Sequence, residues 1–370
     1  MNKKKILLIH ESLRGGGAEK VLIDILNNFD YNRYDIDFLL LQKDGVYLSQ
    51  IPNQVRLLDF QIKKYPRFIK CALVRTRLYW PLLKKQLRSF FKNRHYDTVI
   101  SFMESITAKC HSYLLNIGDR NISWIHTDMI NNHYSKSYFP IPNSERDLYR
   151  KIDDIVFVSK EAKTQFSKLF NLDKGRVIYN LIDRNKIIEK SLLENPKKEK
   201  FTICNIGRLI TVKRQDRVIE VAKLLKDKGY DIDFWIIGEG ELRQKLLQQA
   251  KDLDVESNVH FLGFRNPYPY LRVADLFLLT SDAEGFPLVV SEALCLSKPI
   301  VSTAITGPIE QLGNGEYGRL TGFTSKEIAD AIEDLIKNPN KLSKYSQKAK
   351  ERGIKYFDVE NTMNQIYEII

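Results

Sequence analysis

Two glutamates, Glu284 and Glu292, stand eight residues apart around a Gly-Phe-Pro in the stretch SDAEGFPLVVSEALC (281–295). Paired carboxylates can hydrolyse glycosidic bonds, and one of the two is then expected to stay protonated. Ionised carboxylates can instead accept hydrogen bonds from sugar or ribose hydroxyls without moving a proton. The residues around the two glutamates decide between these chemistries.

Candidate cations for such a site lie in the loop GRLITVKRQD (207–216). Gly207 ends an apolar run, and Arg208 and Lys213 follow on one loop, with Arg214 beside them. Two cations between a strand and a helix suit a diphosphate, which arginine and lysine bind through charge-assisted hydrogen bonds. A solvated basic loop is the alternative.

The segment that carries the glutamates predicts a loop followed by a helix. Residues 280–286 follow an apolar run, and Pro287 fits the first helical position, where its missing N–H costs nothing. Gly285 adds flexible backbone before the helix. The backbone N–H groups expected to point out of the helix N-terminus are those of Phe286, Leu288 and Val289. An open N-terminus and nearby cations favour ionised carboxylates, so we interpret both glutamates as acceptors for hydroxyls around a bound phosphate.

Other candidate ligand contacts also follow apolar runs. The loop SLRGGGAEK (12–20) contains Gly16 and Gly17, which let a ligand approach the backbone before a helix from about Ala18. A phosphate or an anionic transition state suits that loop; a tight strand–helix turn is the alternative. Gly238 and Phe264 also follow strand ends, where their backbone could contact a ligand. A ligand contact and a structural role are both open for a histidine at the end of ISWIH, His126.

Apolar runs alternate with helical patterns along the whole chain, which predicts βαβ units and parallel sheets. At 370 residues the chain suggests two domains. The polar stretch 184–200 is interpreted as the linker between two doubly wound domains, in which ligands bind outside the carboxyl ends of the strands. The expected first-half strands cover 5–10, 35–42, 55–60, 97–102, 122–126, 154–159 and 177–181. Those of the second half cover 201–209, 232–240, 259–264, 275–281 and 298–303.

Composition is typical of a folded protein of a reducing compartment. The chain is 43% apolar, and its four cysteines form no C-x-x-C pair and have no zinc-ligand spacing, so they fit a cytoplasmic location. No apolar run is long enough to span a membrane.

The net charge of +12 arises from one segment, 63–94, which holds eleven Lys and Arg and no Asp or Glu. Helical spacing across 67–93, with Pro81 starting a second short helix, places Trp80, Phe90 and Phe91 among these cations. We interpret the segment as an interfacial one that docks on anionic lipid, partly by inserting its aromatics. An ordinary helix with a solvated basic face is the alternative. No motif for nucleic acid accompanies the charge.

At this point a family resemblance becomes clear. GGGAE (15–19), His126, GRLITVK (207–213) and EGFPLVVSE (284–292) resemble the retaining glycosyltransferases of family four, and VIYNLID (177–183) is similar to the segment that opens their second domain. The resemblance implies a GT-B fold: two Rossmann-like α/β domains facing a cleft, here 1–180 for the acceptor and 181–352 for a nucleotide sugar. A C-terminal helix over 353–370 is expected to pack back on the first domain.

The resemblance also implies roles for the residues above. Arg208 and Lys213 would bind the diphosphate of the donor, Glu292 the ribose hydroxyls, and Glu284 with the amides after it the transferred sugar. His126 would approach the sugar, and the glycine loop the diphosphate or the acceptor. No metal ion or other cofactor is expected, since the cations neutralise the leaving diphosphate, and transfer would follow a same-face route without a protein nucleophile. The family often has a further glycine at the position of Thr306, so the role of that loop stays open.

The expected enzyme is a cytoplasmic transferase on the inner face of the plasma membrane. It would move a hexose or N-acetylhexosamine from a UDP-sugar to a lipid-linked glycan or cell-surface polysaccharide. A sugar-nucleotide epimerase of the same fold, which needs catalytic acids not identifiable here, and a catalytically silent nucleotide-sugar-binding scaffold are the alternatives.

Overall fold

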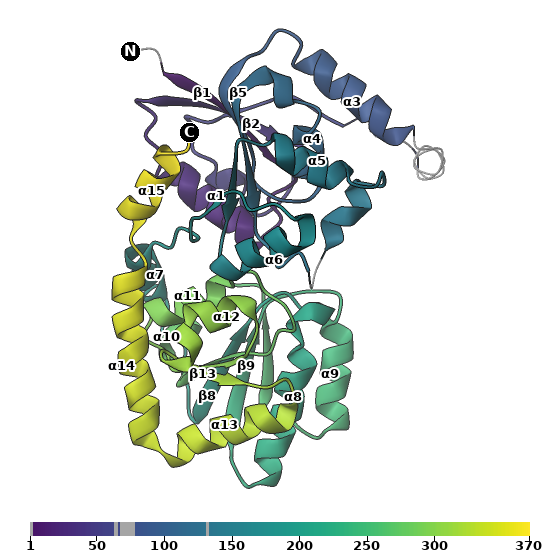
Figure 1. Ribbon diagram of the computed structural model, residues 1–370. Helices are drawn as coiled ribbons and strands as arrows, with labels where there is room; N and C mark the ends of the chain where they lie inside the picture. The colour runs from purple at the N-terminus through teal and green to yellow at the C-terminus, as the bar shows by residue number, and fades with distance from the viewer. Residues whose placement is uncertain (1–2, 63–65, 67–77, 131–132) are drawn as a thin grey trace. The chain divides into compact units, whose positions relative to one another are not determined.

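The computed structural model describes residues 3–62, 66, 78–130 and 133–370. These residues divide into two compact units. Unit 1 comprises 1–181 together with 360–370, and unit 2 comprises 182–359. Each unit is a parallel sheet with helices, as drawn in Figure 1, and this is the expected pair of Rossmann-like α/β domains.

Unit 1 is built on a seven-stranded parallel sheet of order β3-β2-β1-β4-β5-β6-β7. Its central strand β1 reads KKILLIH, and the last five residues are buried because both faces of a parallel sheet are covered. The strands are β1 Lys4–His10, β2 Tyr34–Leu40, β3 Arg56–Leu57, β4 Tyr96–Ser101, β5 Gly118–Ile125, β6 Asp154–Phe157 and β7 Arg176–Val177. The helices are α1 Gly17–Asn27, α3 Tyr79–Phe90, α4 Ile106–His111, α5 Ser144–Lys151, α6 Lys160–Phe170 and α15 Val359–Tyr367.

Unit 2 is built on a six-stranded parallel sheet of order β10-β9-β8-β11-β12-β13. The strands are β8 Phe201–Ile206, β9 Ile232–Ile237, β10 Val259–Gly263, β11 Leu276–Leu279, β12 Ile300–Thr303 and β13 Arg319–Thr321. The helices are α7 Arg184–Ser191, α8 Gln215–Asp227, α9 Arg243–Asp252, α10 Tyr268–Val273, α11 Leu288–Cys295, α12 Thr306–Gln311, α13 Ser325–Lys337 and α14 Pro339–Tyr356. Alternate strand residues enter two separate apolar cores: Ile203 and Leu278 pack with α8 and α13, whereas Cys204 and Phe277 pack with α11.

Each sheet has one point where the strand order reverses: between β1 and β4 in unit 1, and between β8 and β11 in unit 2. The loops after these two strands diverge to opposite faces of the sheet and leave a crevice at their carboxyl ends. The switch points therefore bring together the loop 207–214 with 280–287, and the loop 11–17 with 102–105.

Several local expectations need correction. The stretch 184–200 is not simply a linker, because its first half forms α7, which Asp183 caps by accepting from the Lys186 N–H (3.0 Å) and which buries Ile187. The strand expected over 177–181 ends at Val177, and β13 was not anticipated because its three residues are too short for a pattern. Residues 353–370 are not one helix, since α14 ends at Tyr356 and α15 begins at Val359.

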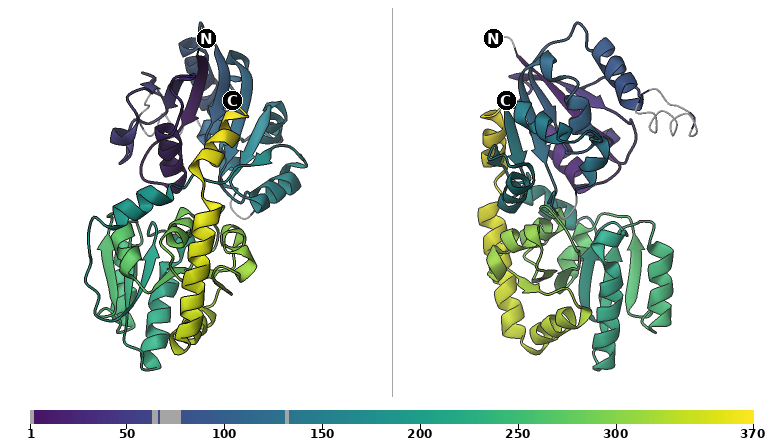
Figure 2. Two further views of the ribbon diagram at one scale, coloured as in Figure 1. Left: turned by 90° about the vertical axis from the view of Figure 1, so that its left-hand side faces the viewer. Right: turned by 45° about the vertical axis from the view of Figure 1, so that its right-hand side comes forward.

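The aromatics assigned to lipid insertion face the protein instead. Phe91 is buried, and Trp80 and Phe90 pack against the core cluster that holds Leu83 and Leu87 of α3. Helix α3 is the blue helix beside the grey trace in the right-hand view of Figure 2. Helix α3 begins two residues before Pro81, close to the expected start. The first half of the basic segment, apart from Pro66, lies outside the described residues, and with it the first of the two expected helices. Among the described residues, no helix is long and apolar enough to cross a membrane.

Candidate functional site

The crevice residues of unit 2 form a connected set at the carboxyl ends of β8 and β11. The ammonium of Lys213 forms an ion pair with Oε1 of Glu284, and the Ser281 hydroxyl donates to the same oxygen (2.9 Å). Both charged side chains are largely buried, with 18% of Lys213 and 15% of Glu284 exposed. The sequence expectation placed these two residues on different parts of a ligand; the structure shows that they also neutralise each other.

The two loops are held together by main-chain contacts and by a second charged cluster. Thr280 donates its hydroxyl to the Lys213 carbonyl (3.0 Å), and the Asp282 N–H donates to the Val212 carbonyl (2.9 Å). Arg214 and Arg217 both pair with Asp282, at 3.1 and 2.6 Å. Arg214, noted in the sequence beside the two candidate cations, is thus tied into the loop structure.

Arg208 differs from its neighbours because its side chain is exposed. Within the described ranges its guanidinium makes no hydrogen bond and no ion pair. Its backbone is fixed, since the Gln215 amide donates to the Arg208 carbonyl (3.1 Å). The site therefore presents one cation already paired with a carboxylate and one that is open to an anion.

Glu292 lies on α11, one turn beyond its start, and is 4% exposed. The hydroxyl of Tyr268, at the start of α10, donates to Oε1 of Glu292 (2.9 Å). Tyr268 is not predictable from the strand-end pattern, because it precedes the glutamate by 24 residues and follows no strand directly. Pro287 is the N-cap of α11 rather than its first residue, and Gly285, Phe286 and Leu288 beside it are buried.

Two glycines shape this edge for different reasons. A Cβ on Gly238 would lie 1.9 Å from the Gly207 carbonyl oxygen, so the fold itself requires glycine there. A Cβ on Gly207 would meet nothing closer than 3.6 Å, so the fold tolerates a side chain and any need for glycine would come from a ligand. Phe264, after β10, is 63% exposed at the same edge and offers a ring face for stacking.

Gly307 shows one structural role of the loop at Thr306, whose role the sequence left open. Its N–H donates to the Glu284 carbonyl (3.2 Å), and a Cβ there would lie 2.6 Å from Cδ of Pro287 and 2.8 Å from the Gly285 carbonyl oxygen. The start of α12 thus presses directly on the loop that carries Glu284, which only glycine permits.

The crevice of unit 1 gathers His126, Glu104 and the glycine loop. Glu104, fully buried after β4, accepts from the His126 N–H (2.9 Å), the Thr127 hydroxyl (2.6 Å) and the Tyr134 hydroxyl (2.9 Å). Burial raises the pKa of Glu104, and these hydrogen bonds oppose the rise. Glu104 stands three residues after a strand end, so the rule that identified His126 could also have identified it.

His126 is held as a neutral imidazole. Burial, with a smaller contribution from nearby His10, lowers the pKa of His126 to about 3. Burial also lowers the pKa of His10 to about 4. The Phe102 ring lies between the two histidines, 6.2 Å from His10 and 4.8 Å from His126 by ring centroids. Within the described chain, Nε2 of His126 and Nδ1 of His10 are buried without a hydrogen-bond partner.

The glycine loop does not present all of its amides to a ligand. The carboxylate of Glu19 accepts from the N–H groups of Gly15 and Gly16, at 2.6 and 2.9 Å, and so caps α1. Gly17 is the first residue of that helix. A phosphate would have to compete with Glu19 for the first two amides, so the sequence-based role of Gly16 and Gly17 stays a prediction.

Comparison with known proteins identifies the family. Residues 15–186 match the family described as Glycosyltransferase Family 4, and residues 186–352 match Glycosyl transferases group 1. Together the two matches span nearly the whole chain. The chain belongs to glycosyltransferase family four. Its two α/β units are those of the GT-B fold, and glycosyltransferase activity follows from the family.

Relatives and solved structures agree with this assignment. The chain is 28% identical to an uncharacterized glycosyltransferase of Haemophilus influenzae, over 90% of this chain and 91% of that protein. It is 26% identical, over 96% of each chain, to an N-acetylgalactosamine-N,N'-diacetylbacillosaminyl-diphospho-undecaprenol 4-alpha-N-acetylgalactosaminyltransferase of Campylobacter jejuni. The structure of Anabaena HepE in complex with UDP and glucose matches with a TM-score of 0.79 and 23% identity, over 99% of this chain and 98% of that one. This last likeness concerns the fold alone.

Proposed function

We propose that this glycosyltransferase is a retaining enzyme that transfers a hexose or N-acetylhexosamine from a UDP-sugar to a lipid-linked glycan or a cell-surface polysaccharide. The observation that carries the proposal is the charged set at the switch point of unit 2: the Lys213–Glu284 pair, the open cation of Arg208 and the buried carboxylate of Glu292. Two cations suit a diphosphate, and two carboxylates suit the hydroxyls on either side of it.

In the proposed reaction the bond between the sugar C1 and the diphosphate oxygen breaks, and the acceptor oxygen bonds to C1 on the same face. Because the acceptor oxygen attacks C1 directly, no protein nucleophile takes part, and the acceptor proton passes to the departing diphosphate. Lys213 and Arg208 stabilise the charge that the diphosphate gains, which lowers the barrier more than it strengthens ground-state binding. In this proposal fixed cations, rather than a metal ion, neutralise the charge of the leaving diphosphate. His126, neutral in the structure, would exchange a hydrogen bond with a sugar hydroxyl.

Donor and acceptor classes rest on the relatives as well as on the site. HepE is described as a complex with UDP and glucose, and the Campylobacter relative is named for a diphospho-undecaprenol glycan. A relative of Staphylococcus aureus, 26% identical over 58% of this chain and 43% of that protein, is named a poly(ribitol-phosphate) alpha-N-acetylglucosaminyltransferase. These names support a UDP-linked donor and an envelope glycan acceptor, and hence an enzyme at the inner face of the plasma membrane.

The test begins with a panel of UDP- and GDP-sugars. The true donor should protect the protein against thermal unfolding, because a ligand bound by the native state raises its stability. NMR of the product made with that donor should show the anomeric configuration of the donor. An inverted product would refute the retaining route, and protection by GDP-sugars alone would refute the UDP assignment.

Lys213→Ala tests whether the Lys213 cation takes part in transfer. Loss of one charge-stabilising contact at a transition state costs on the order of 10²–10³ in rate. We expect that loss in turnover together with a lower unfolding temperature, because the change leaves the largely buried Glu284 carboxylate without its cation. Near-normal transfer by a folded Lys213→Ala protein would remove the cation pair from the mechanism.

A further inference from the structure

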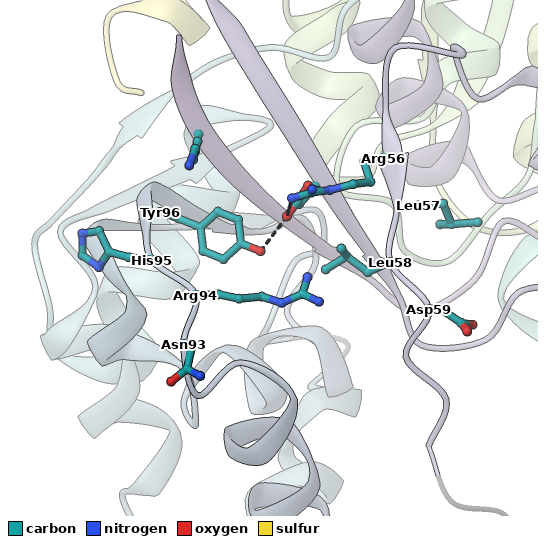
Figure 3. Close-up of a pocket in the computed structure, with 10 residues that line it drawn as sticks. Arg56, Leu57, Leu58, Asp59, Asn93, Arg94, His95 and Tyr96 are labelled. Carbon is teal, nitrogen blue, oxygen red and sulfur yellow. Dashed lines mark hydrogen bonds and ion pairs between the residues drawn. The ribbon is translucent and has the colours of Figure 1, made fainter. Parts of the chain in front are cut away.

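Unit 1 contains a cavity of about 460 Å³ at the opposite edge of its sheet from His126. Figure 3 shows the residues that line it. It opens where strands begin: Lys5 lies at the start of β1 and Tyr96 at the start of β4. The carboxyl end of β1 is His10, five residues along the strand from Lys5, which separates the two edges by roughly 16 Å. The cavity is therefore not part of the candidate site described above.

A buried carboxylate forms its floor and is already neutralised. Asp37 is 5% exposed and accepts from Nε and Nη2 of Arg56, at 2.5 and 2.6 Å, and from the Tyr96 hydroxyl at 2.7 Å. These two contacts use only part of the five N–H donors of a guanidinium. The Arg56 side chain is 71% exposed, so its remaining donors can reach a ligand.

Two further cations line the cavity without an ion-pair partner among the described residues, Lys5 and Arg94. The guanidinium of Arg94 points into the cavity beside the Tyr96 ring (Figure 3), and it lies 4.5 Å from the ring centroid of Phe90. The other acidic residue of the lining, Asp59, pairs with Lys43 outside the cavity (2.9 Å), and 92% of its side chain is exposed. The lining thus holds three cations, Lys5, Arg56 and Arg94, against two carboxylates, Asp37 and Asp59, which leaves one positive charge in excess.

We propose that this cavity is a second anion site, which binds a phosphate ester through Arg94, Lys5 and the outward face of Arg56. Arginine forks bind phosphate oxygens two at a time, and a lysine adds a point charge. The volume exceeds that of a phosphate group alone, so the site has room for the glycerol or sugar to which the phosphate is attached. A phospholipid headgroup and a free phosphate ester share this chemistry.

The soluble source is tested by calorimetry with glycerol 3-phosphate, in the presence of saturating UDP. The parent protein should bind, and Arg94→Gln or Lys5→Gln should weaken binding by about 10-fold, the usual size of a lost hydrogen bond to a charged group. Arg94→Lys keeps the charge and the aliphatic stem, so it should bind within a few-fold of the parent and shows that the cavity still folds. Lys84→Gln removes one charge from α3 outside the cavity and should change nothing.

The lipid source is tested by cosedimentation with phosphatidylcholine vesicles that contain phosphatidic acid. If a headgroup occupies the cavity, Arg94→Gln should reduce binding several-fold more than Lys84→Gln. If the natural ligand is a free ester, the two variants should sediment alike while glycerol 3-phosphate still distinguishes them. The proposal fails if neither probe separates Arg94→Gln and Lys5→Gln from Lys84→Gln, or if UDP abolishes the binding of glycerol 3-phosphate.

Discussion

Glu284 already has two partners within the protein, the ammonium of Lys213 and the hydroxyl of Ser281. An ammonium has three N–H donors, so a diphosphate that binds Lys213 either shares the cation with this carboxylate or takes its place. In the second case Glu284 would be released to the sugar hydroxyls. Glu292, on α11, accepts from the Tyr268 hydroxyl (2.9 Å).

The two glutamates should therefore respond differently to UDP. Glu292→Gln should weaken UDP binding by about 10-fold, since an accepted hydrogen bond to a charged group is typically worth 1.5–3 kcal/mol. Glu284→Gln should leave UDP affinity intact or raise it, because it removes a competing negative charge, yet it should impair use of the complete donor. Calorimetry with UDP and with the intact UDP-sugar distinguishes the two effects.

Tyr268→Phe is the control for Glu292. It removes the hydroxyl that orients the carboxylate but leaves the charge, so its effect on UDP affinity should be smaller than that of Glu292→Gln. Equal losses of UDP affinity in Glu284→Gln and Glu292→Gln would contradict the division of roles.

At the scale of elements, the start of α12 supports the loop between β11 and α11. The contact depends on the absence of a side chain at Gly307, where a Cβ would approach Pro287 and the Gly285 carbonyl too closely. The 284–287 backbone is thereby held between two helix starts.

Gly307→Ala should move this loop and so weaken donor binding by about 10-fold or more. Its effect on the free energy of unfolding should be smaller. A small-to-large change in a packed region typically costs 1–3 kcal/mol of stability. Gly207→Ala is the matched control for stability, because its Cβ fits the fold with no contact under 3.6 Å. Calorimetry with the donor and thermal unfolding measure the two effects; unchanged donor affinity in Gly307→Ala would refute this role.

Helix α3 keeps a basic outer surface although its aromatics face inward. Lys85, Arg88 and Lys92 are exposed, whereas Tyr79, Leu83 and Leu87 are buried. Any attraction to a membrane through this helix would be electrostatic, without the insertion that the sequence suggested.

Changing Lys84, Lys85, Arg88 and Lys92 to glutamine should sharply reduce binding to anionic vesicles, since each such charge is worth about 1 kcal/mol near the surface. Binding of the parent should fall as salt shortens the Debye length. Transfer to a short water-soluble acceptor should survive, because none of the four residues lies in the candidate site. If cosedimentation does not depend on lipid charge, α3 is an ordinary helix with a solvated basic face.

At the scale of the whole molecule, the chain completes unit 1 only with its last eleven residues, 360–370. The Tyr367 ring stacks on Tyr34 at 5.5 Å, and its hydroxyl accepts from the Asp30 N–H (2.8 Å). Lys4 on β1 donates to the Ile370 carbonyl (3.0 Å). Four apolar side chains of this segment are buried, those of Met363, Ile366, Ile369 and Ile370.

Removal of residues 360–370 should destabilise unit 1 by several kcal/mol, since each buried side chain of this kind contributes about 1.5–3 kcal/mol. Calorimetry should show a lower first transition, and limited proteolysis should begin in unit 1. Tyr367→Phe keeps the ring and should cost only about 1 kcal/mol. An unfolding profile unchanged by the truncation would show that the segment is dispensable.

The sequence by itself determined the parallel α/β class, most of the strands and the position of the candidate residues just after them. This was possible because a buried parallel strand needs a continuous apolar run, and polar residues that end such runs collect at one edge. His126, Arg208, Lys213 and Glu284 were found in this way.

Only the tertiary structure decided which of these residues meet. Lys213 pairs with Glu284, 71 residues away, because β8 and β11 are neighbours at the switch point, and strand order follows from non-local packing that periodicity does not encode. Glu19 occupies the Gly15 and Gly16 amides, and Trp80 and Phe90 pack inward, for a related reason. Residue type and spacing state what a side chain can do, whereas its partner depends on which surfaces the fold brings into contact.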